Sequence, residues 1–166
     1  DFLPPEQAGE PYQQDPHLLV QSPSNPDRLW VQHHNGIFVS SDGSKSWSEI
    51  HADPSSFGFA VAVHPREPDT AWFVPGIKDE LRIPVDGKLI VTCTRDGGRT
   101  WQSLGKGLPQ DHAYDIAYRH ALTIDETGDR LASGTTTGNV YVTEDQGNSW
   151  QTLSNSVRPE HAVRFM

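Results

Sequence analysis

Acidic, hydroxyl, glycine and tryptophan residues recur together in three octapeptides, a mixture that could catalyse a reaction, bind calcium or form a turn. The octapeptides are SSDGSKSW at 40–47, TRDGGRTW at 94–101 and TEDQGNSW at 143–150. An EF-hand calcium loop would need further spaced acids and a closing Glu, which these stretches lack. In a turn, an Asp carboxylate accepts hydrogen bonds from backbone amides and glycine permits a positive φ. We therefore interpret these three stretches, called corners below, as structural turns.

The corners share one pattern: a hydroxyl residue, any residue, Asp, any residue, usually Gly, any residue, a hydroxyl residue and Trp. The first corner departs from it, because Ser44 stands where the others have Gly98 and Gly147. The spacing of roughly 50 residues between the tryptophans is typical of propeller blades or solenoid units. The residues that we assign a structural role are Asp42, Trp47, Asp96, Gly98, Trp101, Asp145, Gly147 and Trp150.

The segments around each corner repeat as well. A short apolar run opened by Gly36, Gly87 or Gly138 precedes the corner, and a short tail such as WSEI follows it. Further upstream lie two more strand-like runs per unit, at 17–21 and 28–32, 59–63 and 70–74, and 114–118 and 130–134. Runs rich in Val, Ile, Phe and Tyr between Gly, Pro, Asn and Asp indicate strands and turns. Each unit is therefore predicted to be a meander of four strands, A to D.

The repeated meander predicts an all-β protein built from β-propeller blades. We expect an extended linker at 1–14, blades at 15–56, 57–112 and 113–160, and the inner strand of a further blade at 161–166. The dipeptide Asn35-Gly36 is a hairpin signal between strands B and C of the first unit. Trp30 and Trp72 occupy matching positions in the B strands, so we expect both in the core.

Three blades and one strand are too few for a closed ring, because propellers usually have four to eight blades. We expect the chain to be part of a six- to eight-bladed propeller, either as a fragment or as a half-propeller that closes as a homo-oligomer. A lone stack of three blades would leave sheet faces uncovered at both ends.

The corners resemble Asp-boxes, or BNR repeats, which are known from sialidases, sortilin-type receptors and uncharacterised bacterial glycosyl hydrolase-like propellers. The resemblance covers roughly residues 15–153, and the second and third corners match at every defined position. It implies that the corners lie on the outer part of the face opposite the active site. A ligand site is then expected on the face that the B–C turns and the D–A links share.

The longest B–C segment, residues 77–87, concentrates charged side chains, and long loops on a rigid scaffold often carry function. Its Arg82-Ile83-Pro84 resembles the Arg-Ile-Pro motif of sialidases, whose arginine binds a substrate carboxylate. A solvated or salt-bridged loop charge is the alternative interpretation of Arg82. The Tyr nucleophile with its Glu partner and two further arginines, which a sialidase also needs, have no placement in this sequence.

Two sets of site residues follow. The repeat register places His17, Phe59, Tyr114 and His161 near the mouth of the central channel. The candidate ligand-binding residues are Lys78, Arg82, His17, His34, His112, Tyr114 and His161. The candidate catalytic carboxyl groups, two of which would have to converge in one cleft for glycoside hydrolysis, are Asp79, Glu80, Asp111 and Asp115. A zinc site from His17, His34, His112 and His161 is conceivable, but no local spacing supports it, so we predict neither a metal nor a cofactor.

The amino-acid composition limits the classes of partner that we expect. The formal net charge of −9 and the pI near 5.2 argue against nucleic-acid and anionic-membrane binding, which use basic surfaces. The single cysteine, Cys93, excludes an intrachain disulfide framework. No apolar stretch reaches transmembrane length. The residues do not indicate a location; the cytoplasm is slightly favoured, and we expect the native N-terminus to be absent.

Two functions are weighed. The first is a binding or assembly scaffold that holds a carbohydrate or protein ligand on the B–C/D–A face. The alternative is a sialidase-like glycoside hydrolase whose catalytic groups are shared with missing or partner blades.

Overall fold

The computed structural model describes residues 14–166, so all of the predicted linker except Gln14 lies outside the described residues. Three four-stranded antiparallel sheets follow one another, each a meander in chain order. The strands of the first sheet are β1 Pro16–Gln21, β2 Leu29–His33, β3 Gly36–Ser40 and β4 Ser48–Ile50. Those of the second are β5 Gly58–Val63, β6 Ala71–Pro75, β7 Val91–Thr94 and β8 Gln102–Leu104. Those of the third are β9 Leu122–Ile124, β10 Leu131–Gly134, β11 Val140–Thr143 and β12 Gln151–Ser154.

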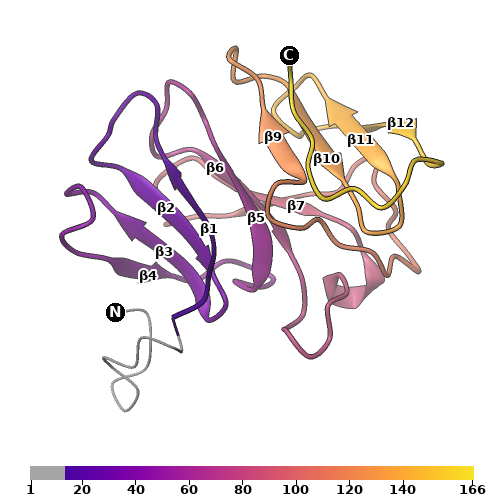
Figure 1. Ribbon diagram of the computed structural model, residues 1–166, viewed down its shortest axis with the longest axis horizontal. Helices are drawn as coiled ribbons and strands as arrows, with labels where there is room; N and C mark the ends of the chain where they lie inside the picture. Colours follow the sequence, from indigo (N-terminus) through magenta and orange to yellow (C-terminus); the bar gives the residue numbers. More distant parts are fainter. Residues whose placement is uncertain (1–13) are drawn as a thin grey trace.

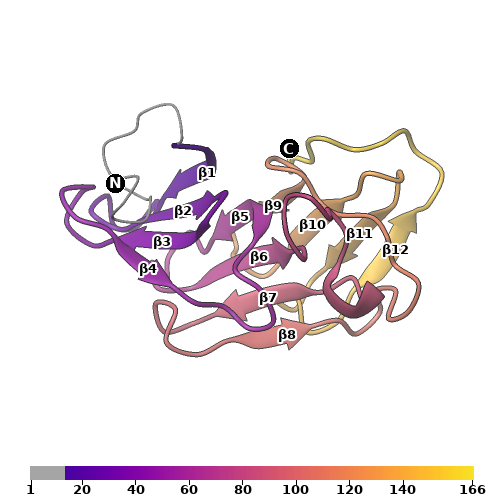
Figure 2. The same ribbon diagram turned by 90° about the horizontal axis from the view of Figure 1, so that it is seen from below.

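The sheets lie side by side in chain order, from the indigo first sheet to the orange and yellow third sheet (Figure 1). The first strand of each sheet is the inner one, because β1 contacts β5 and β5 contacts β9. Figure 2 shows the strands of the first two sheets following outward from β1 to β4 and from β5 to β8. This is the predicted arrangement of propeller blades. Within residues 14–166, no helix is long and apolar enough to cross a membrane.

Two apolar cores hold the stack together, one at each junction between sheets. The first contains Trp30, Ile37, Val39, Val61, Val63, Ala71 and Phe73. The second, larger core joins the second and third sheets through residues such as Trp72, Val91, Leu104, Leu131 and Tyr141. Successive residues of a strand point to opposite faces, so neighbours on β6 serve different cores. Phe73 therefore contributes to the first core and Trp72 to the second.

Each corner forms a hydrogen-bonded turn. The Asp96 carboxylate accepts hydrogen bonds from the Thr100 amide at 2.9 Å and the Thr100 hydroxyl at 2.7 Å. The Thr94 hydroxyl donates to Asp96 at 3.0 Å and accepts from the Gly98 amide at 2.9 Å. The same network recurs around Asp42 and Asp145. Of the corner tryptophans, Trp101 packs against the first core and Trp150 lies within the second.

Backbone hydrogen bonds fix which turns share a face. Each corner donates to the A–B turn of its own unit, as in the bond from Gly97 N to Asp69 O at 3.0 Å. The equivalent bonds run from Gly43 to Asp27 and from Gln146 to Asp129. On the other face each B–C segment donates to the preceding D–A link, namely His34 to Asp15, Gly76 to Phe57 and Thr136 to Ile116. The C–D corners therefore share one face with the A–B turns, and the B–C segments share the other face with the D–A links.

The predicted inner strand of the third unit at 114–118 is wrong, because the inner strand is β9 at Leu122–Ile124. A short turn closes the β9–β10 hairpin, with Asp125 N bonded to Arg130 O at 3.0 Å, so the strand must come directly before it. Residues 113–121 instead form an irregular link that buries Ala113, Ala117 and Ala121 in the second core. These alanine residues are therefore buried although the link is not part of a sheet.

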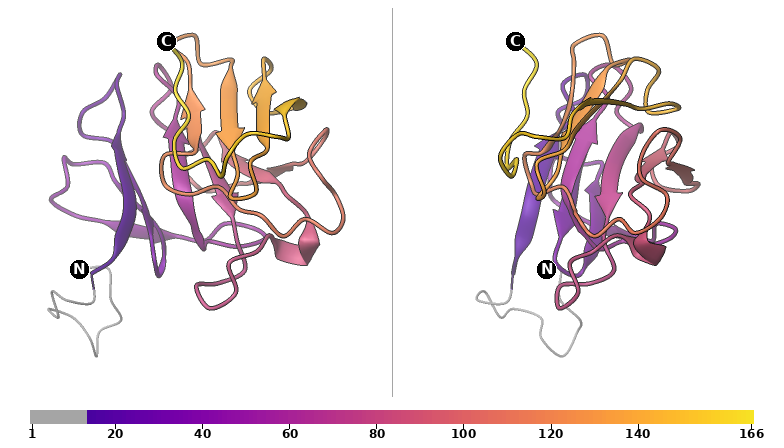
Figure 3. Two further views of the ribbon diagram at one scale, coloured as in Figure 1. Left: turned by 45° about the vertical axis from the view of Figure 1, so that its right-hand side comes forward. Right: turned by 90° about the vertical axis from the view of Figure 1, so that its right-hand side faces the viewer.

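Residues 161–166, expected to form an inner strand, form only an isolated parallel bridge between His120 and Ala162. A strand needs a paired neighbour, whereas this segment lies beside the irregular link, with Val163 N bonded to His120 O at 3.0 Å. Figure 3 shows the chain after β12 returning across the third sheet. It comes so close that a Cβ on Gly134 would lie 2.6 Å from the Cβ of Glu160.

Candidate functional site

The ring of Phe59, at the start of β5, is the centre of an aromatic and cationic group on the B–C/D–A face. The His17 imidazole stacks on it with ring centroids 4.4 Å apart. The guanidinium carbons of Arg82 and Arg119 lie over the Phe59 ring at 5.3 and 5.8 Å, and the Tyr118 ring meets it edge-on at 5.1 Å. We call His17, Phe59, Arg82, Tyr118, Arg119 and His161 the Phe59 cluster.

Irregular pairing at the start of two inner strands positions the first two members. The β1–β2 register shifts between Pro16 and Leu18, and the β5–β6 register shifts between Gly58 and Val61. Such bulges re-aim side chains next to functional sites. Each shift spans a ring of the cluster, His17 in β1 or Phe59 in β5. Both rings are buried, at 5% and 2% exposure.

The β6–β7 segment supplies Arg82, the irregular link supplies Tyr118 and Arg119, and the C-terminal segment supplies His161. The Ala121 amide donates to the Tyr118 carbonyl at 2.8 Å, which closes a turn just before β9. The His161 ring stacks on Tyr118 with centroids 5.7 Å apart and an interplanar angle of 10°. Together with His120, the two arginines and these two rings line a shallow cavity of about 320 Å³. Three segments distant in sequence therefore meet at one surface.

The two arginines differ in their electrostatic partners. Arg82 forms an ion pair with Asp79 at 2.5 Å, and its Nε donates to the Asp79 carbonyl at 3.1 Å. Desolvation lowers the pKa of Arg82, but hydrogen bonding to Tyr118 and Asp79 outweighs it and raises the pKa above its usual value. Arg119 is exposed and forms no ion pair with any residue in 14–166. Among the residues 14–166, the guanidinium of Arg119 therefore has no anionic partner, whereas that of Arg82 is paired with Asp79.

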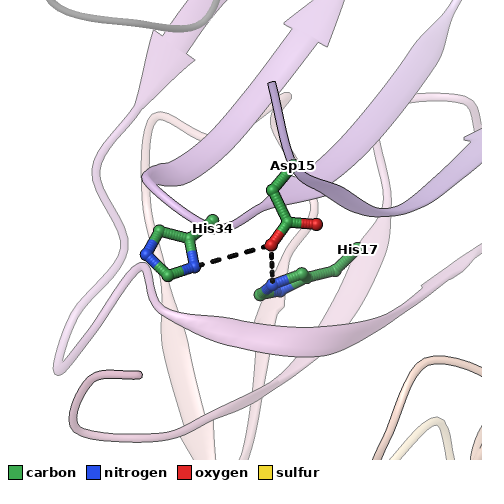
Figure 4. Close-up of side chains that lie close together, drawn as sticks. All are labelled: Asp15, His17 and His34. Carbon is green, nitrogen blue, oxygen red and sulfur yellow. Dashed lines mark ion pairs between the residues drawn. The ribbon is translucent and has the colours of Figure 1, made fainter. Parts of the chain in front are cut away.

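A second group lies beside the cluster, where Asp15, His17 and His34 converge (Figure 4). The Asp15 carboxylate oxygen Oδ2 is 3.7 Å from Nε2 of His17 and 3.8 Å from Nδ1 of His34. The backbone joins the same residues, since the His34 amide donates to the Asp15 carbonyl at 3.0 Å. Burial lowers the pKa of His17 and outweighs the opposing influence of its bond to Gly58 and of Asp15.

The candidate carboxyl groups have separate partners. Asp79 pairs with Arg82, and Glu80 lies 3.8 Å from the Lys78 ammonium at an exposed position. Asp115 is buried and accepts hydrogen bonds from Thr137 at 2.8 Å and Asn139 at 3.2 Å, which tie the D–A link to the β10–β11 turn. Asp111 is exposed. The cavity lining includes none of these four carboxyl groups.

The structure places one of the predicted mouth residues, Tyr114, outside the cavity. Tyr114 is 62% exposed, and its hydroxyl lies 3.3 Å from Nδ1 of the exposed His112, outside the cavity lining. With β9 at 122–124, the register equates His120, not Tyr114, with His17 and Phe59. The four histidines considered for a zinc site, His17, His34, His112 and His161, do not come together. Only His17 and His34 lie close to each other, and they do so beside Asp15.

Sequence reasoning missed Tyr118 and Arg119 as site residues, because it placed them within a strand. A signal for them was present. The run ALTI at 121–124 directly precedes the turn segment DETGDR at 125–130. Choosing that run as the inner strand would have put Tyr118 and Arg119 in the D–A link.

The sequence matches no family model and no curated protein. Among solved structures, an ancestral GH74 enzyme is 18% identical, covering 85% of this chain and 18% of that chain, with a TM-score of 0.65. The GH74 xyloglucanase from Xanthomonas campestris is 16% identical, with coverages of 82% and 20% and a TM-score of 0.62. YCF48 from Cyanidioschyzon merolae is 19% identical, with coverages of 87% and 38% and a TM-score of 0.56.

A structure of YCF48 bound to D1 peptide is also similar, at 17% identity, coverages of 89% and 48% and a TM-score of 0.55. The chain spans less than half the length of each of these proteins. They are β-propeller proteins, so the three sheets are blades of a partial β-propeller. At these identities the likeness shows the fold alone.

Proposed function

We propose that this propeller segment is a binding or assembly scaffold whose Phe59 cluster binds a carboxylate-bearing segment of a protein partner. The observation that carries the proposal is the meeting of two guanidinium groups, Arg82 and Arg119, at one shallow cavity of about 320 Å³. Arginine forms strong, geometrically specific hydrogen bonds to carboxylates. The rings of Tyr118 and His161, which also line the cavity, offer flat surfaces for apolar or aromatic side chains.

A protein partner is favoured over a free anion for two reasons. The cavity is open and is built from B–C and D–A segments, which present it to a large ligand. YCF48, whose fold is similar, binds a D1 peptide. The overall charge of −9 would repel acidic partners from most of the surface, so the cluster would also select the site of docking.

We also propose that the corners are Asp-boxes. Their role in this account is mechanical, because their hydrogen bonds hold the C–D turns opposite the ligand face. Further blades, or a second copy of the chain, would complete the ring beyond the third sheet, where Leu153 of β12 is 68% exposed. If a second copy completes the ring, light scattering of the purified chain over a range of concentrations should show a dimer.

A glycoside hydrolase is the second candidate function, favoured by the likeness to GH74 enzymes. Hydrolysis by the usual route needs two carboxyl groups flanking the scissile bond. Asp79, Glu80, Asp111 and Asp115 would have to be joined by carboxyl groups of other blades. Release of reducing sugar from xyloglucan or from a sialoside, lost in an Asp79→Asn variant, would support this candidate over the scaffold.

Selection from random peptide libraries, one with free and one with amidated carboxyl termini, tests the scaffold. We expect the selected peptides to carry carboxylates and to bind at least tenfold more weakly to Arg82→Gln and Arg119→Gln variants. Arg99→Gln is the matched control, because Arg99 is an exposed arginine on a corner at the opposite face. Selected peptides without carboxylates, or equal losses in all three variants, would contradict the proposal.

A further inference from the structure

The hydrogen bonding of His17 determines which ring nitrogen is free. Its Nδ1 lies 2.6 Å from the carbonyl oxygen of Gly58, and a carbonyl can only accept, so Nδ1 carries a proton. In the neutral ring Nε2 then presents a lone pair. That lone pair lies 3.7 Å from Oδ2 of Asp15, which is also an acceptor. Two acceptors face each other across a gap too long for a hydrogen bond.

Histidines that bind metals commonly show this arrangement. The ring nitrogen that does not bind the ion donates to a backbone carbonyl or carboxylate, which fixes the tautomer and the orientation of the ring. His17 is further held by stacking on Phe59 at 4.4 Å, and its side chain is only 2% exposed. One ligand nitrogen is therefore positioned before any ion arrives.

Asp15 and His34 supply the other two candidate ligands, and both are accessible to solvent. Nδ1 of His34 lies 3.8 Å from Oδ2 of Asp15, and the three ligand atoms all lie within 4.8 Å of one another. The side chains of Asp15 and His34 are 57% and 38% exposed, so an ion could enter from solvent and both side chains could rotate toward it. Ligand atoms in a tetrahedral zinc site lie about 3.3 Å apart, so this group would contract by up to about 1.5 Å on binding an ion.

We propose that Asp15, His17 and His34 bind one divalent transition-metal ion, of which Zn²⁺ is the representative. Two imidazoles and one carboxylate favour Zn²⁺, Co²⁺, Ni²⁺ or Cu²⁺ over Mg²⁺ and Ca²⁺, which prefer oxygen ligands. Three protein ligands leave a coordination position open for water or for a group of a partner. The site borders the Phe59 cluster through His17 but does not depend on the proposed function of that cluster.

The test uses the tag-free 166-residue chain after treatment with a chelator. Co²⁺ is added while visible absorption is recorded, and Zn²⁺ affinity is measured by competition with a chromophoric chelator. We expect one Co²⁺ per chain, displacement of Co²⁺ by Zn²⁺, and no competition from Mg²⁺ or Ca²⁺. His34→Ala and Asp15→Asn should each weaken Zn²⁺ binding at least tenfold, because each removes one ligand.

His51→Ala is the matched control, because Nδ1 of His51 lies 3.9 Å from the Glu49 carboxylate but has no third ligand. It should bind Zn²⁺ as the wild type does. Since His17 is buried, the test relies on the two exposed ligands, whose variants should melt at the wild-type temperature without metal. Zn²⁺ should raise the melting temperature of the wild type and of His51→Ala, but not of His34→Ala or Asp15→Asn. Absence of stoichiometric Co²⁺ binding, or unchanged Zn²⁺ affinity in His34→Ala, would overturn the proposal.

Discussion

The indole Nε1 of Trp72 donates a hydrogen bond to the backbone carbonyl of Gln146 at 3.0 Å, joining the second sheet to the third corner. Trp30 makes a related bond one sheet earlier, to the carbonyl of Pro68 at 3.0 Å. Both indoles are fully buried. Each junction between sheets thus combines apolar packing with a hydrogen bond from a buried indole, which helps to fix how neighbouring blades sit and hence where the Phe59 cluster forms.

Trp72→Phe should therefore destabilise the chain by roughly 1–3 kcal/mol, because it removes a buried donor and leaves the Gln146 carbonyl unpaired. The loss of indole volume adds to this cost. Urea unfolding followed by circular dichroism measures the change. Leu153→Ala, at an exposed position of β12, is the comparison and should change stability much less. Equal effects of the two substitutions would refute the role assigned to the indole.

The corner aspartates should make stability depend on pH below 4. Hydrogen bonds from the Thr100 side chain and amide lower the pKa of Asp96 from 3.8 to about 2. A depressed pKa gives stability that is fully present above the unfolded value and is lost as pH falls toward 2. The free energy of unfolding of the wild type should fall between pH 4 and pH 2, and less steeply in Asp96→Asn. Parallel curves for the two proteins would show that Asp96 does not contribute.

The first corner holds a correctable strain. Ser44 has a φ of 70°, in the left-handed region, where the second and third corners have glycine. A left-handed conformation costs a non-glycine residue roughly 1–2 kcal/mol, part of which glycine returns as unfolded-state entropy. Ser44→Gly should raise the free energy of unfolding by about 0.5–1 kcal/mol.

The reciprocal change supplies the control for this prediction. Gly98 has a φ of 94°, and a Cβ there would lie 2.5 Å from side-chain atoms of Ile50. Gly98→Ser should therefore lower the melting temperature while Ser44→Gly raises it. Shifts in the same direction for both variants would show that the corners are not equivalent.

Cys93 should not react in the folded protein. Burial raises the pKa of its thiol to about 11, and the residue is only 1% exposed in the second core. The thiolate is the reactive form. A thiol reagent such as dithionitrobenzoate should modify Cys93 only as fast as the protein unfolds, and fully in urea. Rapid labelling in native buffer would contradict the placement of the Cys93 side chain in the core between the second and third sheets.

Local patterns were sufficient to predict most of the fold. Among the described residues, the glycine-opened runs, the tails after the corners and the apolar runs further upstream located all the strands except the third inner one, because each of these signals lies within a few residues of its strand. The third inner strand was wrong because two apolar runs, at 114–118 and 121–124, competed for one place. Only the length of the turn that follows, bonded from Asp125 to Arg130, decides between them.

The candidate site was predictable only in part, because long-range packing assembles it. The meander placed His17, Phe59, Arg82 and His161 on one face, yet it contained no signal that Arg82 would lie over Phe59. The convergence of Asp15 and His34 on His17 depends on the β1–β2 register shift, which sequence alone does not reveal.

The scaffold proposal is tested most directly by a double-substitution cycle between Arg119 and the carboxylate of a selected peptide. Fluorescence anisotropy gives the dissociation constants of the wild type and Arg119→Gln, each with the acid and the amide form of the peptide. If the guanidinium contacts the carboxylate, either change alone should weaken binding at least tenfold, and the second change should then add little. Two losses that simply multiply would show that Arg119 and the carboxylate act independently, and would contradict the account.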